Sequence, residues 1–201
     1  MEVPVLIGYT IARNYFNERI ATLLITVLFL LLLEIEYVRL EYHPKLPEIF
    51  NVLRYREQNN VTGTIFFIAA TIIVFAAFDY PIAVSALVLT VFGDLAAALI
   101  GIKFGSTFLY KDKTLEGTLA GFTMNCLIGY LFLPAYPMIF LPMAFVASLV
   151  ELLTGKLDDN LTVPLFSAFT GQIMVYLLHA PLTTFPGPVV GSILNLFVNF
   201  H

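Results

Sequence analysis

Six long apolar runs set the limits on what this chain can fold into. They occupy residues 20–37, 61–78, 81–102, 117–133, 138–154 and 161–180. An α-helix needs about 20 apolar residues to cross the hydrocarbon core of a bilayer, and each run approaches that length. Only 12% of the residues are charged, whereas soluble domains carry about 25%. The sequence therefore predicts an all-α, polytopic helical membrane protein with six or seven transmembrane helices.

The two ends of the chain fit this pattern less well than the middle. Residues 1–19 contain an apolar stretch, 3–12, that is too short to cross a membrane. An acidic second residue and the lack of a basic n-region argue against a cleavable signal peptide. Residues 181–201 are apolar but interrupted by three prolines, so we expect an interfacial or re-entrant segment or part of a seventh helix. We treat residues 1–201 as a single integral membrane domain.

The basic residues predict the orientation of the helices. Eight of the ten Lys and Arg residues lie in the connections 38–60, 103–116 and 155–160, and the tight turns 79–80 and 134–137 contain none. Because Lys and Arg are enriched in cytoplasmic loops, these three connections are expected to face the cytoplasm. Arg13 and Arg19 do not fit this orientation. The net charge of −4 argues against a basic nucleic-acid-binding protein.

Asp94 stands inside the apolar run "LTVFGDLAAALIG". A carboxylate within a spanning helix costs about 2.5–3.5 kcal/mol on insertion scales, so we expect a function for it. The alternative is an acid that only hydrogen-bonds to neighbouring helices. Gly93, Ala97, Gly101 and Gly105 recur every four residues beside it. This stripe of small residues predicts close approach of another helix or of a ligand.

The segment "KDKTLEG" places a burst of charge before the apolar run that begins near Gly117. Unpaired amide groups and partial positive charge at a helix start favour anions, and lysines suit phosphate. Lys111 and Lys113 are therefore candidates for phosphate binding, with Thr114 as a cap and Glu116 as a possible cation ligand. The alternative is ordinary basic flanking of a membrane helix. The spacing is not that of a Walker A loop.

The segment "ELLTGKLDDN" supplies a third polar group, with Glu151, Asp158, Asp159 and Asn160. Carboxylate and amide oxygens are hard ligands that suit Mg²⁺. A nucleoside triphosphate would explain lysines and acids together, because the acids hold the metal and the lysines hold the phosphates. A solvated loop is the alternative interpretation.

Two further patterns complete the set of candidate residues. The loop 39–60 carries Arg54, Arg56 and Glu57, and arginine is well shaped for bidentate contact with phosphate. The three histidines are isolated, and neither G-x-S-x-G nor H-E-x-x-H occurs, which argues against a serine lipase and a zinc protease.

The motifs "LRYREQNNVTGTIFF", "FGDLAAALIGIKFG", "KDKTLEGTLAGF" and "VELLTGKLDDNLTVPL" cover about residues 53–166. In this order they resemble the CTP-dependent prenol kinases, the family of dolichol (polyprenol) kinase and phytol kinase, which is related to CTP-using diacylglycerol kinases. The resemblance implies an integral membrane kinase that uses CTP and a divalent metal to phosphorylate a long isoprenoid alcohol. It departs from the family near the N-terminus, where Arg13, Asn14 and Asn17 stand in place of an Arg-Lys pair and a His.

The residues that match the family's motifs would build the site for CTP and the metal. They are Arg54, Glu57, Asp94, Gly101, Lys113, Glu116, Gly117, Asp158, Asp159 and Asn160. Phosphoryl transfer mainly requires positioning and charge neutralisation. We therefore expect Lys111, Lys113, Thr114 and the helix start near Gly117 to hold the triphosphate.

Acidic residues are expected to supply the metal ligands and the base. Mg²⁺ would bind among Asp94, Glu116, Asp158 and Asp159. These acids would also act in catalysis, with Asp94 or Asp158 accepting the hydroxyl proton of an alcohol that enters from the bilayer. Three alternatives remain open at this point: a cytidylyltransferase that acts on a lipid phosphate, a diacylglycerol kinase, and a transporter or channel with intramembrane acids.

Overall fold

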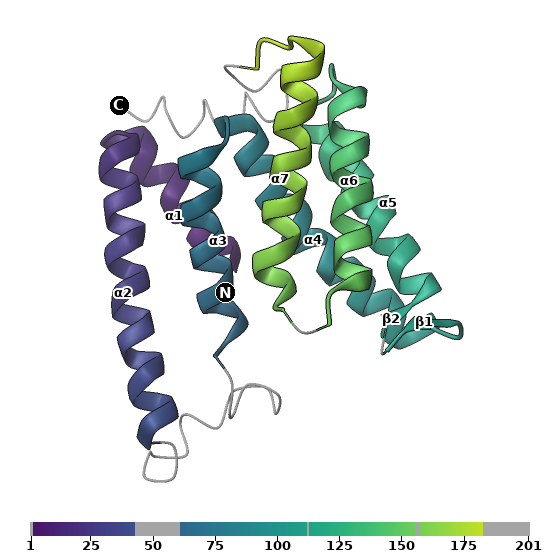
Figure 1. The fold of residues 1–201 in the computed structure, drawn as a ribbon, viewed down its shortest axis with the longest axis horizontal. Coiled ribbons are helices and arrows are strands. Elements are labelled where there is room, and N and C mark those ends of the chain that lie inside the picture. Colours follow the sequence, from purple (N-terminus) through teal and green to yellow (C-terminus); the bar gives the residue numbers. More distant parts are fainter. Residues whose placement is uncertain (1, 43–60, 112, 156, 183–201) are drawn as a thin grey trace. The chain divides into compact units, whose positions relative to one another are not determined.

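The computed structural model describes residues 2–42, 61–111, 113–155 and 157–182 of the chain. This part forms seven α-helices and one two-stranded antiparallel sheet (Figure 1). The helices are α1 (Glu2–Tyr15), α2 (Glu18–Tyr42), α3 (Gly63–Ala77), α4 (Tyr80–Phe104), α5 (Leu115–Phe132), α6 (Pro137–Leu153) and α7 (Asp159–Leu178). The strands are β1 (Phe108–Tyr110) and β2 (Lys113–Thr114).

Each of the six apolar runs forms a helix, so the predicted all-α class is confirmed. The small β1–β2 hairpin was not predicted, and neither was helix α1 within residues 1–19. Within the described ranges, three helices are long and apolar enough to cross a membrane, namely Glu18–Glu41, Tyr80–Phe104 and Asp159–Leu178. Helices α3 and α6 are apolar but shorter. The helices are thus those of a membrane protein; most of the predicted tail, residues 183–201, lies outside the described residues.

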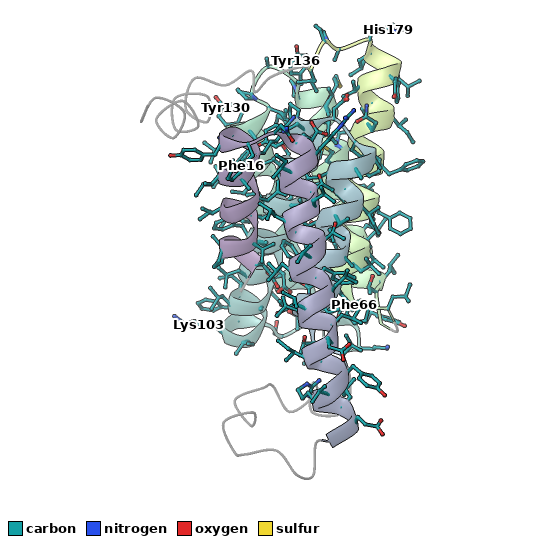
Figure 2. The ribbon with its side chains drawn as sticks, turned by 90° about the vertical axis from the view of Figure 1, so that its left-hand side faces the viewer. Phe16, Phe66, Lys103, Tyr130, Tyr136 and His179 are labelled. Carbon is teal, nitrogen blue, oxygen red and sulfur yellow. The ribbon has the colours of Figure 1, made fainter. Side chains whose placement is uncertain are left out.

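The chain divides into two compact units, Met1–Ile72 and Ile73–His201. In the first unit, α1 and α2 form a helical hairpin whose turn includes Phe16, labelled in Figure 2. The Asn17 side chain caps α2 by accepting a hydrogen bond from the Ile20 amide at 2.9 Å. Because this cap starts α2 directly after α1 has ended, residues 2–19 belong to a folded helical hairpin.

A buried ion pair also belongs to the first unit. Arg39 was counted among the loop residues, but it lies in α2 and donates to both carboxylate oxygens of Glu36, at 2.9 and 2.8 Å. The same carboxylate accepts a hydrogen bond from the amide of Thr62, just before α3, at 2.7 Å. Sequence reasoning missed this pair, because Arg39 looked like one more basic residue at a membrane edge.

The second unit is built around helices α4 to α7, which run alternately up and down. Lys103 lies at one end of this unit, and Tyr136 and His179 lie at the other (Figure 2). We call the first end the charged end: α4 and α6 finish there, α5 and α7 begin there, and the β1–β2 hairpin lies beside them (Figure 1). At the opposite end the side chains of Asp79 and Gln172 join the start of α4 to α7, with Gln172 Nε2 donating to Asp79 Oδ2 at 2.8 Å.

Small residues let α4 and α5 approach each other closely. A Cβ atom placed on Gly117 would lie 2.8 Å from the carbonyl oxygen of Ala97 and 3.2 Å from the Cα of Gly101. A Cβ on Gly121 would lie 3.3 Å from the carbonyl oxygen of Gly93. The predicted stripe on α4 therefore packs against two glycines of α5, and the backbones are the contacting groups.

This packing predicts that one methyl group added at the contact between α4 and α5 lowers the stability of the fold. Gly117→Ala should destabilise the protein by about 1–3 kcal/mol, because backbone atoms cannot yield as a flexible side chain can. Thermal unfolding in detergent measures the change. Gly8→Ala in α1 is the matched control, since a Cβ there meets nothing within 4 Å. Equal stability of the two variants would contradict the close helix contact.

Candidate functional site

Most charged side chains of the second unit gather at its charged end. In the part of this unit that the structure describes, they come from the end of α4, the hairpin, the start of α5, the end of α6 and the start of α7. They are Asp94, Lys103, Lys111, Lys113, Glu116, Glu151, Asp158 and Asp159. The polar residues of three segments that are far apart in sequence thus lie at one end of the second unit. The segments are "LTVFGDLAAALIG", "KDKTLEG" and "ELLTGKLDDN".

The ammonium group of Lys113 lies at the centre of this group. Its Nζ atom is 3.4 Å from Glu151 Oε1 and 3.4 Å from Asp159 Oδ2. Asp94 of α4 also acts electrostatically on Lys113 and on Glu151. We call these four residues the Lys113 cluster. Three carboxylates thus face one ammonium, which leaves an excess of two negative charges if all are ionised.

The surroundings of Lys113 shift its pKa in a definite direction. Burial of the ammonium group lowers the pKa, but the charges of Glu151, Asp159 and Asp94 act in the opposite direction. The result is a pKa raised above the ordinary value of 10.5. Lys113 is therefore held in its charged form by the acids around it.

The start of α5 has the predicted cap. The Thr114 side chain accepts a hydrogen bond from the Gly117 amide at 3.2 Å. A Cβ atom on Gly101 would lie 3.2 Å from the Thr114 hydroxyl oxygen, so the end of α4 packs directly on this cap. The contact positions the start of α5, and with it Lys113, one residue before the cap.

Glu116 has partners different from those expected of a metal ligand. One carboxylate oxygen accepts from the Ser106 hydroxyl, and the other accepts from the amides of Ser106 and Thr107 at 3.2 Å each. Glu116 thus fixes the connection between α4 and the hairpin, and the structure gives it this positioning task instead of a place in the Lys113 cluster.

Lys111 joins the hairpin to the connection between α6 and α7. Its Nζ donates to the carbonyl oxygen of Gly155 at 2.9 Å and lies 5.5 Å from the ring centre of Tyr110. Its φ angle of 50° lies in the left-handed region, which is unfavourable for a side chain with a Cβ. The predicted phosphate-binding residue is therefore exposed and close to Lys113, in a strained turn.

Asp158 and Asp159 are adjacent but have different environments. Asp158 Oδ1 accepts a hydrogen bond from the Asn160 amide at 3.0 Å and caps α7, whereas Asp159 reaches Lys113. Across the described ranges, no group of three or more His, Cys, Asp or Glu side chains is gathered closely enough to hold a metal ion. The predicted ligand set of Asp94, Glu116, Asp158 and Asp159 is thus not assembled here as one shell.

Glu151 is the residue that sequence reasoning undervalued. It was grouped with the nearby acids as an oxygen ligand suited to Mg²⁺ but left out of the predicted metal set, yet its side chain is buried and contacts Lys113. The available signal was an acid two helical turns before Asp158, at the end of an otherwise apolar run. Two further candidates, Arg54 and Glu57, lie outside the described residues.

Comparison with known proteins gives one distant similarity. An uncharacterized protein of Methanocaldococcus jannaschii is 33% identical over 132 residues, which cover 64% of this chain and 66% of the relative. The match therefore spans slightly less than two thirds of the length of that protein. No family model and no solved structure matches the chain.

The raised pKa of Lys113 predicts a specific dependence of stability on pH. A folded-state pKa above the unfolded value contributes stability that is complete below 10.5 and is lost as the pH rises through the folded pKa. Lys113→Arg keeps its charge in this range, because guanidinium does not lose its proton there. Thermal unfolding across alkaline pH should show a smaller loss in this variant than in the wild type.

The control for this experiment is Lys103→Arg. Lys103 is exposed at the end of α4 and lies over the ring of Phe104, so the same substitution there should leave the pH profile of the wild type unchanged. Parallel profiles for the wild type and Lys113→Arg would contradict the electrostatic role of the acids.

Proposed function

We propose that the protein is a CTP-dependent kinase that phosphorylates a membrane isoprenoid alcohol of the polyprenol or dolichol type. The single observation that carries the proposal is the Lys113 cluster. Acids from α4, α6 and α7 meet a lysine that directly precedes the start of α5. These residues belong to three of the four segments that resemble the prenol kinase motifs, and that resemblance supplies the substrate class.

The proposed topology has α2 to α7 crossing the membrane, with the charged end on the cytoplasmic side. Its support is the position of Lys103, Lys111 and Lys113 at that end of the second unit, together with the enrichment of basic residues in cytoplasmic loops. A soluble nucleotide would then reach the site from the cytoplasm, and the alcohol would reach it sideways from the bilayer.

The phosphates of CTP would bind between the hairpin and the start of α5. Lys111 and Lys113 supply positive charge there, and the first amide groups of α5 add the partial positive charge of a helix start. Lys111 donates to a backbone carbonyl oxygen, which a phosphate oxygen could replace. By resemblance, Arg54 and Glu57 would add contacts from the preceding loop.

A divalent cation fits the acids of the Lys113 cluster by charge and by ligand chemistry. Two carboxylates of the cluster contact a single ammonium group, and carboxylates are preferred protein ligands of Mg²⁺. The described acids are not gathered closely enough to form a ligand shell by themselves, so the ion would arrive on the triphosphate, and the acids of the Lys113 cluster would attract it by their charge. In this proposal Glu116 and Asp158 position the hairpin and α7, because their carboxylates hold local amide groups.

The acids and lysines perform different parts of the proposed phosphoryl transfer. Asp94 accepts the proton of the alcohol hydroxyl, whose oxygen forms the new bond to the γ-phosphorus. The bond between that phosphorus and the β-phosphate oxygen breaks, and CDP leaves. Lys113 stabilises charge on the transferring group, in keeping with a reaction that depends on positioning and electrostatics.

Labelled CTP distinguishes this reaction from its nearest alternative. With the label in the γ-phosphate, a kinase transfers the label to the lipid alcohol, whereas a cytidylyltransferase releases it as pyrophosphate. We expect label on a polyprenol in the presence of Mg²⁺, measured by thin-layer chromatography of the extracted lipid. Label in pyrophosphate with a lipid phosphate as acceptor would assign cytidylyl transfer instead.

Asp94→Asn should lower kcat by on the order of 100-fold or more, since it removes a proton acceptor and one charge of the site. Asp79→Asn is the matched control, because it makes the same change at the other end of the same helix, where Asp79 bonds to Gln172. The control should keep activity within about twofold. An Asp94→Asn protein that folds and retains full activity would remove the proposed base.

A further inference from the structure

Strand β1 presents an apolar surface outside the helices. The side chains of Phe108, Leu109 and Tyr110 are 69%, 47% and 43% exposed. Successive side chains of a strand point to opposite faces, so β1 is apolar on both faces. An exposed run of this kind at the end of a helical bundle calls for a partner that covers it.

The hairpin is held in this position by several contacts. Glu116 binds the amides of Ser106 and Thr107 ahead of β1, and the Leu115 amide donates to the Thr107 carbonyl oxygen at 2.8 Å. Beyond β1, Lys111 bonds to the Gly155 carbonyl oxygen. These bonds fix both ends of the strand, so its apolar side chains are kept outward as a feature of the fold.

The neighbours of β1 indicate what covers it. The last turn of α4 ends two residues before Ser106 and exposes Ile102 by 87% and Phe104 by 58%. Lys103 and Lys111 flank the apolar side chains, and their ammonium groups lie 5.2 Å and 5.5 Å from the ring centres of Phe104 and Tyr110. Aromatic rings with adjacent lysines are typical of segments at the boundary between lipid headgroups and acyl chains.

We propose that β1 is seated in the lipid surface, with Phe108 and Leu109 at the level where headgroups meet acyl chains. The partner is the bilayer itself, and the flanking lysines favour anionic headgroups. This inference does not depend on the proposed kinase activity. The proposal also sets the depth of the candidate site in the membrane. Because β2 pairs with β1 and carries Lys113, the Lys113 cluster lies at headgroup level, within reach of a lipid's polar group.

The chain contains no tryptophan, so Phe108→Trp introduces a single tryptophan, whose fluorescence is excited at a wavelength where tyrosine does not absorb. The variant is reconstituted into bilayers of palmitoyl-oleoyl phosphatidylcholine with a quarter phosphatidylglycerol. Part of the phosphatidylcholine carries bromine either near the glycerol end of its acyl chain or near the methyl end. We expect the shallow bromine to quench the fluorescence on the order of twofold more strongly than the deep bromine.

Two further variants keep the test decisive. Phe169→Trp, at an exposed position midway along α7, should be quenched more by the deep bromine, which calibrates depth. Leu109→Trp reports on the other face of β1 and should also be quenched at shallow depth, which covers the case in which Phe108→Trp does not fold. Quenching of the β1 tryptophans only by aqueous iodide, only by the deep bromine, or by none of these would overturn the proposal.

Discussion

The ammonium group of Lys113 lies between carboxylates of two helices, and the charged end of the second unit is organised around it. Removing charges from water is costly unless they are paired, and Glu151 is buried within an apolar helix. Glu151 lies near the end of α6 and Asp159 at the start of α7. Their pairing with Lys113 therefore fixes the positions of both helix ends relative to β2. Asp94 adds a third acid from α4 that acts electrostatically on Lys113 and Glu151.

The helices can bring these charges together because their backbones approach closely. Gly117 and Gly121 of α5 lie against the small-residue stripe of α4, and larger residues would push the start of α5 away from Asp94. Around the cluster, Glu116 holds the entry to the hairpin and Lys111 holds its turn. The same contacts that position Lys113 also keep the apolar side chains of β1 directed outward, so the site and the membrane-facing strand share one support.

Periodicity and hydrophobicity were sufficient to place the six helices α2 to α7, because long apolar runs have few alternatives. The stripe containing Gly93 and Gly101 and the cap at Thr114 were also predicted correctly, since both depend on local spacing. Other features depend on tertiary contacts that spacing does not encode. Glu116 and Asp158 were predicted as metal ligands, and the structure adds hydrogen bonds from nearby amides to their carboxylates that the spacing did not indicate. The pairing of Glu151 with Lys113 was missed because it joins segments whose meeting is decided by the helix arrangement. The β1–β2 hairpin was missed because its strands, of three and two residues, are too short to show an alternating pattern.

Equilibrium binding of CTP to the purified protein tests most directly whether the Lys113 cluster is a site for a cation and a triphosphate. Binding of radiolabelled CTP is measured with Mg²⁺ and again after the cation has been removed by a chelator. The account predicts binding that depends on the cation, because three acids at this end repel a triphosphate whose charge is not neutralised. No binding under either condition, or equal binding with and without the cation, would contradict it.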